Sequence, residues 1–315
     1  MTQAILLALA PVFFVLALGF AAGKLRVVNN RQIDSLNALV MDFALPASLF
    51  VATASASRAQ MLAQAPLFAL YGGVMLLIWL TSYSFRTRVA KASPADASLQ
   101  ALTISFPNLA GVGLPIVAAV LGPGGAVPIA MALAAGSILI TPLSLIVVEM
   151  SGANTAPAAT PVSRILKAFR RALTKPVVLA PALGILLSLL DWKLGAVPAA
   201  CLTLIGHAAA GVALFLTGLI LSAQAFRLDG KVVLATAMAD VVRPLLTAAI
   251  VFALPVPPEM AKTAILLGAL PSGFFGILFA VNYQLDSATP GSMVLASTVF
   301  SVVTLVLTIA LLFPH

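Results

Sequence analysis

Two short polar stretches interrupt an otherwise apolar chain, and their residue types suit the binding of a small anion. Residues 105–115 read SFPNLAGVGLP, and residues 269–273 read ALPSG. Proline and glycine stop a helix, and the helix that restarts after them has free N–H groups in its first turn. These groups and the positive end of the helix dipole favour a carboxylate. We expect the new helices to begin at Leu114–Pro115 and near Gly273–Phe274.

The ligand-contacting positions are expected within these two stretches. Asn108 offers both a hydrogen-bond donor and an acceptor, and Ser272 holds the matching position after the second proline. Asn108 also fits as the cap of the helix that restarts after it, and the two roles are compatible. The predicted substrate-binding set is Pro107, Asn108, Gly111, Gly113, Pro271, Ser272, Gly273 and, from another helix, Arg243.

Four titratable residues lie inside apolar runs, where a central charge costs about 2.5–3.5 kcal/mol on insertion scales. Asp240 and Arg243 are one turn apart. They either pair with each other, or Asp240 binds a coupling cation and Arg243 a second substrate carboxylate. Asp42 and His207 have equivalent places in the two halves, which leaves a structural role or a protonation relay open for each. Asp240, Asp42 and His207 are thus the ion-coupling candidates, and with one cysteine and two histidines we expect no metal site.

The composition indicates that membrane helices hold these residues. Hydrophobic residues make up 62% of the 315 residues and charged ones only 8%, whereas soluble domains carry about a quarter charged residues. Apolar runs long enough to cross a hydrocarbon layer of about 30 Å recur along the chain. The net charge of +8 comes from loop cations, which topology and lipid attraction explain without nucleic acid. We predict an all-α polytopic membrane protein.

Hydropathy and turn residues predict ten spans, at 4–23, 33–54, 64–84, 97–121, 126–149, 176–190, 198–223, 231–254, 261–282 and 288–313. The two polar stretches fall near the middle of the fourth and ninth spans, which are therefore broken helices. Glycines at the ends of GFAAG (19–23) predict a close helix contact.

The two halves of the chain share patterns in the same order. PVFFVLALG resembles PVVLAPALG, AVPIAMALA resembles ATPGSMVLA, and each pair is separated by 162–165 residues. The chain therefore divides into a first five-helix repeat (1–149), a cytoplasmic linker with a basic interfacial helix (150–175) and a second repeat (176–315). Five is an odd number, so the second repeat is inverted. Broken helices at corresponding places of inverted repeats are typical of a transporter's substrate site.

Lysine and arginine predict the orientation, because cytoplasmic loops are enriched in them. Thirteen lie in the loops after spans 1, 3, 5 and 7, and three, Arg58, Lys193 and Lys262, lie in the opposite loops. We expect the first set on the cytoplasmic side of the cell (inner) membrane, with both termini extracytoplasmic.

The broken-helix motifs resemble those of the auxin efflux carrier family, which includes plant PIN-type carriers and bacterial malonate-transporter-like members. PNLAGVGLP, ALPSG followed by FAVNY (279–283), and FALPASLF (43–50) carry the resemblance. It covers essentially all ten spans and implies crossover helices 4 and 9, a homodimeric scaffold of helices 1, 2, 6 and 7, and a mobile domain of the other six. The chain lacks the plant carriers' long loop, so the bacterial members are nearer.

These observations predict a secondary active transporter of small organic anions, malonate-like by resemblance, that works by alternating access. An anion channel is the alternative, and an intramembrane enzyme is a weaker one, since no nucleophile with a base, metal motif or suitably spaced acidic pair occurs. No catalytic residue or cofactor is expected, apart from Na⁺ or H⁺ as a coupling ion. The expected partners are the substrate, the lipid bilayer and a second copy of the chain.

Overall fold

The computed structural model describes residues 2–29, 33–151, 166, 170, 173–223 and 228–313. Helices are the only regular elements in this part of the chain, apart from one isolated bridge. Six described helices are long and apolar enough to span a membrane: Ile33–Ala54, Ala65–Arg88, Val127–Ser151, Ala196–Ser222, Gly230–Ala253 and Ala288–Leu312. The all-helical membrane class is therefore confirmed, while ten crossings and an inverted repeat stay predictions. The predicted basic interfacial helix lies largely outside the described residues.

The helices follow the predicted spans closely. The first half contains α1 (Thr2–Lys24), α2 (Ile33–Ala38), η2 (Leu39–Ala44), α3 (Leu45–Ala54), α4 (Arg58–Ala63), α5 (Ala65–Arg88), α6 (Pro94–Ser105), η3 (Leu109–Gly113), α7 (Leu114–Leu121), η4 (Gly122–Gly125), α8 (Ala126–Ala135), η5 (Gly136–Ile140) and α9 (Thr141–Ser151). The second half contains α11 (Pro176–Leu189), α12 (Ala196–Gly206), α13 (Ala208–Ser222), α14 (Gly230–Ala237), η6 (Met238–Val242), α15 (Arg243–Ala253), α16 (Pro258–Gly268), α17 (Phe275–Asn282) and α18 (Ala288–Leu312).

Three of the long helices contain a π-helical turn just before a proline. The turns η2, η5 and η6 end two residues before Pro46, Pro142 and Pro244. Proline lacks an N–H group, and its ring collides with the carbonyl four residues earlier. The backbone widens accordingly, and the N–H of Arg243, directly before Pro244, donates to the carbonyl five residues back, that of Met238. Such turns recur at functional sites.

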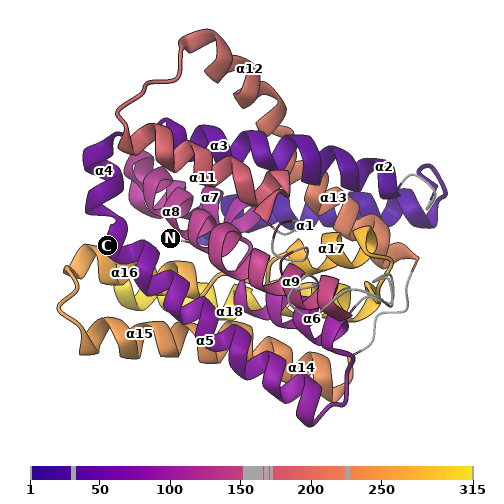
Figure 1. Cartoon of the computed structure of the whole chain (residues 1–315). Helices are drawn as coiled ribbons and strands as arrows, with labels where there is room; N and C mark the ends of the chain where they lie inside the picture. The colour runs from indigo at the N-terminus through magenta and orange to yellow at the C-terminus, as the bar shows by residue number, and fades with distance from the viewer. Residues whose placement is uncertain are drawn as a thin grey trace.

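The helices pack in two groups. In the first group α1 lies along α13, and α3 lies along α11 and α12, with α12 standing out from the edge of the bundle (Figure 1). The predicted close contact at residues 19–23 is present, because a Cβ atom on Gly19 would lie 2.0 Å from the carbonyl oxygen of Phe215 in α13. In the second group α5 packs on α6, α6 on α9 and α17, and α14 on α18.

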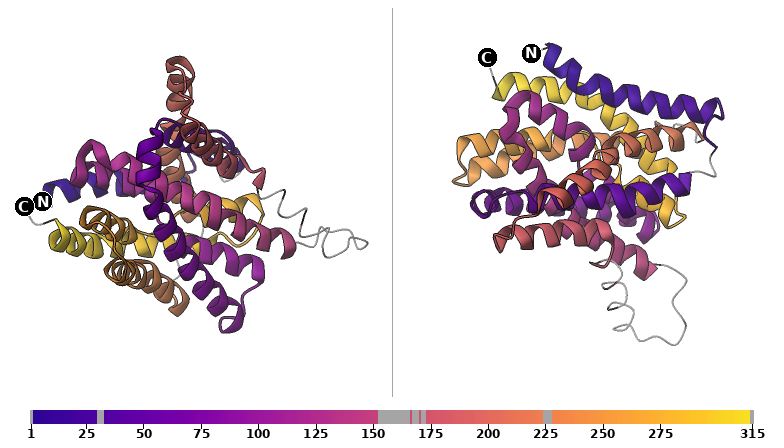
Figure 2. Two further views of the ribbon diagram at one scale, coloured as in Figure 1. Left: turned by 60° about the vertical axis from the view of Figure 1, so that its left-hand side comes forward. Right: turned by 90° about the horizontal axis from the view of Figure 1, so that it is seen from above.

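The N-terminal end of α1 and the C-terminal end of α18 lie at the same end of the bundle (Figure 2). An even number of crossings would place them so. The core is centred on α6, in which Ala95 and every residue from Ala97 to Ser105 are buried. A helix surrounded on all sides by other helices is a stable support for the interruption that follows it.

Candidate functional site

The two interruptions predicted in the fourth and ninth spans lie against each other in the protein interior. The N–H of Asn108 donates to the carbonyl of Pro271, and the N–H of Gly273 donates to the carbonyl of Phe106, both at 2.8 Å. The two extended segments thus satisfy each other's backbone in one antiparallel bridge. Non-helical backbone is tolerated inside a membrane only where protein or a wet cavity surrounds it.

Local chemistry explains why the chain is extended here. A proline disfavours helical geometry in the residue before it, and Phe106, before Pro107, has φ −96° and ψ 105°. Pro107 pairs with Ser272 across the bridge. Gly273 permits the close approach, because a Cβ atom there would lie 2.3 Å from the carbonyl oxygen of Phe106.

Asn108 caps the helix that restarts after the first interruption. Its Oδ1 accepts a hydrogen bond from the N–H of Gly111, and its carbonyl accepts one from Gly113, both at 2.9 Å. The chain therefore becomes helical again at Leu109 as the π-helical turn η3, which the asparagine caps, and the α-helix α7 begins at Leu114, as predicted. The Nδ2 atom has no partner among the described residues, although the side chain is only 2% exposed.

A chain of hydrogen bonds leads away from the second interruption. The N–H of Ser272 donates to Oγ of Ser297 on α18 at 2.8 Å, and Oγ of Ser297 donates to Oδ1 of Asp240 at 2.7 Å. Ser272 is 1% exposed, and its Oγ has no partner in the described part of the chain. Oδ2 of the fully buried Asp240 is likewise without one. The new helix α17 begins at Phe275, close to the predicted start.

Arg243 holds together the ends of the two helices that stop at the crossing. Its Nη1 donates to the carbonyl of Ile104 in α6 at 2.7 Å. Nε donates to the carbonyl of Gly268 at 3.0 Å, and Nη2 donates to that of Leu270. Carbonyls at a helix C-terminus lack partners within the helix, and a cation there is stabilised by the dipole. All three guanidinium nitrogens are engaged with backbone.

Neither arrangement expected for Arg243 from the sequence matches this geometry. Arg243 and Asp240 interact electrostatically, but no ion pair joins them within the described residues. The donors of the guanidinium group point at backbone carbonyls, so we assign Arg243 a positioning role in place of a substrate contact.

Comparison with known proteins gives the family. A family profile described as "Membrane transport protein" matches residues 4–309, nearly the whole chain. The chain belongs to this family. The resemblance to auxin efflux carriers is thereby confirmed. Three relatives carry the name "Uncharacterized transporter YfdV", from Escherichia coli (strain K12), Escherichia coli O157:H7 and Shigella flexneri. Each is 28% identical to this chain over 306 residues, and the match covers 94% of this chain and 94% of the relative.

Two predicted coupling residues of this membrane transport protein lie away from the crossing. Asp42 in η2 and His207, between α12 and α13, are both exposed on the outside of the bundle, unlike the buried residues of the crossing. Large apolar side chains beside them, Phe43 and Leu204, are exposed as well. No group of three histidine, cysteine, aspartate or glutamate residues gathers anywhere in the described ranges.

Sequence reasoning missed two residues beside the crossing of the transport protein. Ser297 links Asp240 to Ser272, and Tyr71 of α5 is fully buried within electrostatic range of Arg243. The Tyr71 hydroxyl has no partner among the described residues. Neither residue belongs to the motifs of the broken helices, so only their place in the fold distinguishes these two.

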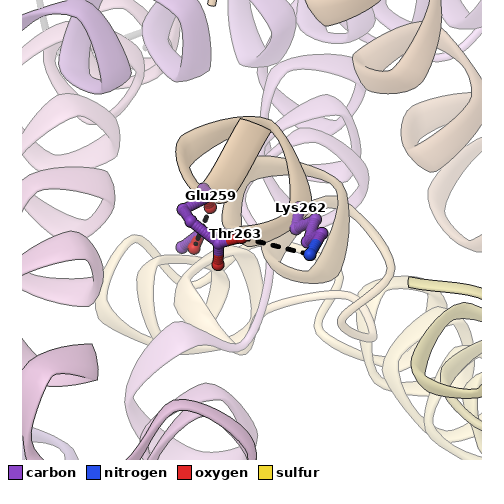
Figure 3. A network of polar contacts seen from close by, with 3 residues as sticks. All are labelled: Glu259, Lys262 and Thr263. Atoms are coloured by element: carbon purple, nitrogen blue, oxygen red, sulfur yellow. Dashed lines mark hydrogen bonds and ion pairs between the residues drawn. The ribbon is translucent and has the colours of Figure 1, made fainter. Parts of the chain in front are cut away.

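The charged groups at the start of α16 are of another kind. Figure 3 shows the ion pair of Lys262 with Glu259 at 3.1 Å and the hydroxyl of Thr263, which donates to the Glu259 carbonyl. Both charged side chains are exposed, and exposed pairs contribute only about 0–1 kcal/mol. This network marks the outer end of α16 and not a binding site.

Proposed function

We propose that this membrane transport protein is a secondary active transporter of small organic anions, binding malonate-like carboxylates where the two broken helices cross. The main support for this proposal is a pair of buried hydrogen-bond donors without a partner among the described residues, Nδ2 of Asn108 and Oγ of Ser272. They lie on the two segments joined by the antiparallel bridge. A buried donor left unpaired costs about 1–3 kcal/mol, and a bound carboxylate would supply the missing acceptor.

The helices that begin beside these donors favour an anion over a neutral ligand. η3 with α7 begins at Leu109, and α17 begins at Phe275. Each N-terminus carries about half a positive charge. The side chains of the crossing are nearly all buried, which favours a small substrate. We expect transport and no enzymatic activity, since the family and the relatives are described as transporters.

Asp240 is the residue proposed to couple a cation to substrate binding. Its Oδ2 is open, while Oδ1 reaches the backbone of Ser272 through Ser297. Binding of H⁺ or Na⁺ at Asp240 would alter this chain of hydrogen bonds and therefore the crossing itself. Movement of the second helix group against the first would provide alternating access.

We propose a homodimer in the cell (inner) membrane, with both termini extracytoplasmic, through helices 1, 2, 6 and 7. These are α1, α2 with α3, α11, and α12 with α13, the group that packs together at one side of the bundle (Figure 1). Asp42 and His207 are exposed on this group, where contact with lipid is unfavourable for a charged group. A partner subunit would cover them.

Transport in proteoliposomes tests the proposed function. Mono- and dicarboxylates would be offered in turn, with imposed gradients of Na⁺ or H⁺. We expect saturable uptake of malonate-like anions that one of the two gradients accelerates. Flux that rises linearly with concentration and ignores both gradients would indicate an anion channel, and no uptake of any carboxylate would refute the proposed substrate class.

A further inference from the structure

A groove lies between α5, α6 and the helix formed by α14 and η6, and Ile104 of α6, whose carbonyl accepts from Arg243, is one of its lining residues. Its volume is about 260 Å³, and its walls include Ser82, Phe85, Arg86, Leu234 and Met238. At Arg86 it meets a second, polar pocket of about 380 Å³, where α6, α14 and α18 begin. Arg86 lines both cavities.

Two hydrogen-bond donors in this groove are buried without a partner. Arg86 is 2% exposed, and although its Nη2 donates to the carbonyl of Lys231 at 2.7 Å, its Nη1 has no partner among the described residues. The hydroxyl of Ser82 is also buried and unpartnered there. Residues four apart share one face of a helix, so both donors serve the same site. The carboxylate of Asp229 lies within electrostatic range of Arg86, but the open donor of this buried guanidinium still needs an acceptor, and an anionic one is the most favourable.

The carboxylates of the polar pocket are already engaged elsewhere. Asp229 accepts a hydrogen bond from the first turn of α14, Asp286 accepts two at the start of α18, and Asp96 accepts one from Ser93 before α6. All three lie at helix N-termini, where acidic side chains are stabilised. None of them bonds Nη1 of Arg86.

The walls of the groove identify the kind of anion. Phe85 and Leu234 are exposed on the outside of the bundle, and Met238 is partly exposed, which suits a hydrocarbon chain and not a hydrated ion. Arg86 lies in the last turn of α5, just before Arg88 and Lys91, where headgroups meet the end of a membrane helix.

We propose that this groove binds an anionic phospholipid, with the phosphate accepting hydrogen bonds from Arg86 and Ser82 and an acyl chain lying along Phe85, Leu234 and Met238. α5 and α14 belong to the helix group that contains the crossing, so the lipid would stabilise that group. The site stands independently of the proposed substrate.

Native mass spectrometry of the purified protein tests this site, with phosphatidylglycerol, phosphatidylethanolamine or inorganic phosphate added. We expect phosphatidylglycerol to bind preferentially. Arg86→Gln should weaken the binding of phosphatidylglycerol about tenfold, which corresponds to a loss of about 1.4 kcal/mol in binding free energy. Arg88→Gln is the matched control, because that arginine is exposed two residues further on, and it should leave binding unchanged.

Ser82→Ala keeps the test decisive if Arg86→Gln fails to fold, since it removes only an unpartnered hydroxyl. It should weaken the binding of phosphatidylglycerol about tenfold, as the loss of a hydrogen bond to a charged group would. Three results would each overturn the proposal. They are equal binding of the two lipids, an equal loss of phosphatidylglycerol binding in the Arg86 and Arg88 variants, and unchanged phosphatidylglycerol binding in Ser82→Ala. Equally strong retention of inorganic phosphate would also overturn it, by showing a site for a free anion.

Discussion

At the crossing, Asn108 uses its two side-chain atoms for different purposes. Oδ1 accepts from the N–H of Gly111 and starts η3, while Nδ2 remains an open donor. A cap stabilises the protein whether or not substrate is present, whereas the open donor stabilises only the bound state. The two contributions are therefore separable by substitution.

Replacing Asn108 by serine and by alanine separates them. Serine is a good helix cap, so Asn108→Ser should melt like the wild type but bind the substrate about tenfold more weakly, as expected for the loss of a hydrogen bond to a charged group. Asn108→Ala should bind as weakly and lose about 1 kcal/mol of stability as well. Thermal melting and the KM of uptake measure the two effects. A wild-type KM in Asn108→Ser would show that the residue is only a cap.

The Arg243 side chain should act through stability. Arg243→Gln leaves the carbonyls of α6 and α16 without a charged donor, which should cost at least about 3 kcal/mol. Asp240→Asn keeps an acceptor for Ser297, so it should fold normally but lose its response to the driving gradient. Because the double variant also lacks the three carbonyl contacts of Arg243, it should stay nearly as unstable as Arg243→Gln alone. Recovered stability in the double variant, measured by thermal melting, would contradict this.

At the scale of the element, prolines set where the polar residues of a helix point. The π turn η6 carries Asp240 and exists because Pro244 follows it. The π turn contains one residue more than a regular α-helical turn. Without it, the side chains before η6 would be rotated about the helix axis by about 100° relative to those after η6, because each residue of an α-helix turns by about that angle. Asp240 would then no longer face Ser297.

Substitution of this proline provides the test. Pro244→Ala restores the missing N–H group and allows a regular α-helix, so the protein should be as stable as the wild type or more so. Gradient-driven uptake should fall strongly because Asp240 is turned away. Pro46→Ala is the matched control, since Pro46 follows η2 in the other helix group. Equal losses of uptake in both variants would show that the orientation of Asp240 is not the cause.

At the scale of the whole molecule, one helix group carries exposed polar residues that a membrane would not favour. α12 stands out from the bundle edge (Figure 1) and bears Cys201, which is exposed and is the one cysteine of the sequence. Packing of a second copy against this group would cover α12 together with Asp42 and His207.

Crosslinking in native membranes tests that arrangement. A bismaleimide reagent should join two copies through Cys201 and produce a dimer band on a denaturing gel. Cys201→Ser should abolish the band and leave uptake unchanged, because the residue lies away from the crossing. A single-subunit mass in native mass spectrometry, with no crosslinked band, would contradict the dimer.

Local chemistry along the chain determined much of this protein. Hydropathy indicates membrane helices, and the missing N–H of Pro107 and the flexibility of Gly273 indicate where two of them break. These signals act within a few residues, so they are readable in order along the sequence. The same residues predict two broken helices, their resemblance to a carrier family implies that the two cross, and the family match supports the class of protein.

Tertiary structure alone decided what the buried polar groups touch. Arg243 bonds the carbonyl of Ile104, 139 residues away, and Asp240 bonds Ser297, 57 residues away. From the sequence, the one-turn spacing of Asp240 and Arg243 suggested an ion pair, yet both side chains found partners on other helices. A buried polar atom bonds whichever complementary group the packing brings within about 3 Å. Which group this is depends on how helices that are distant along the chain pack against each other, and the residues near the polar atom in the sequence do not determine that packing.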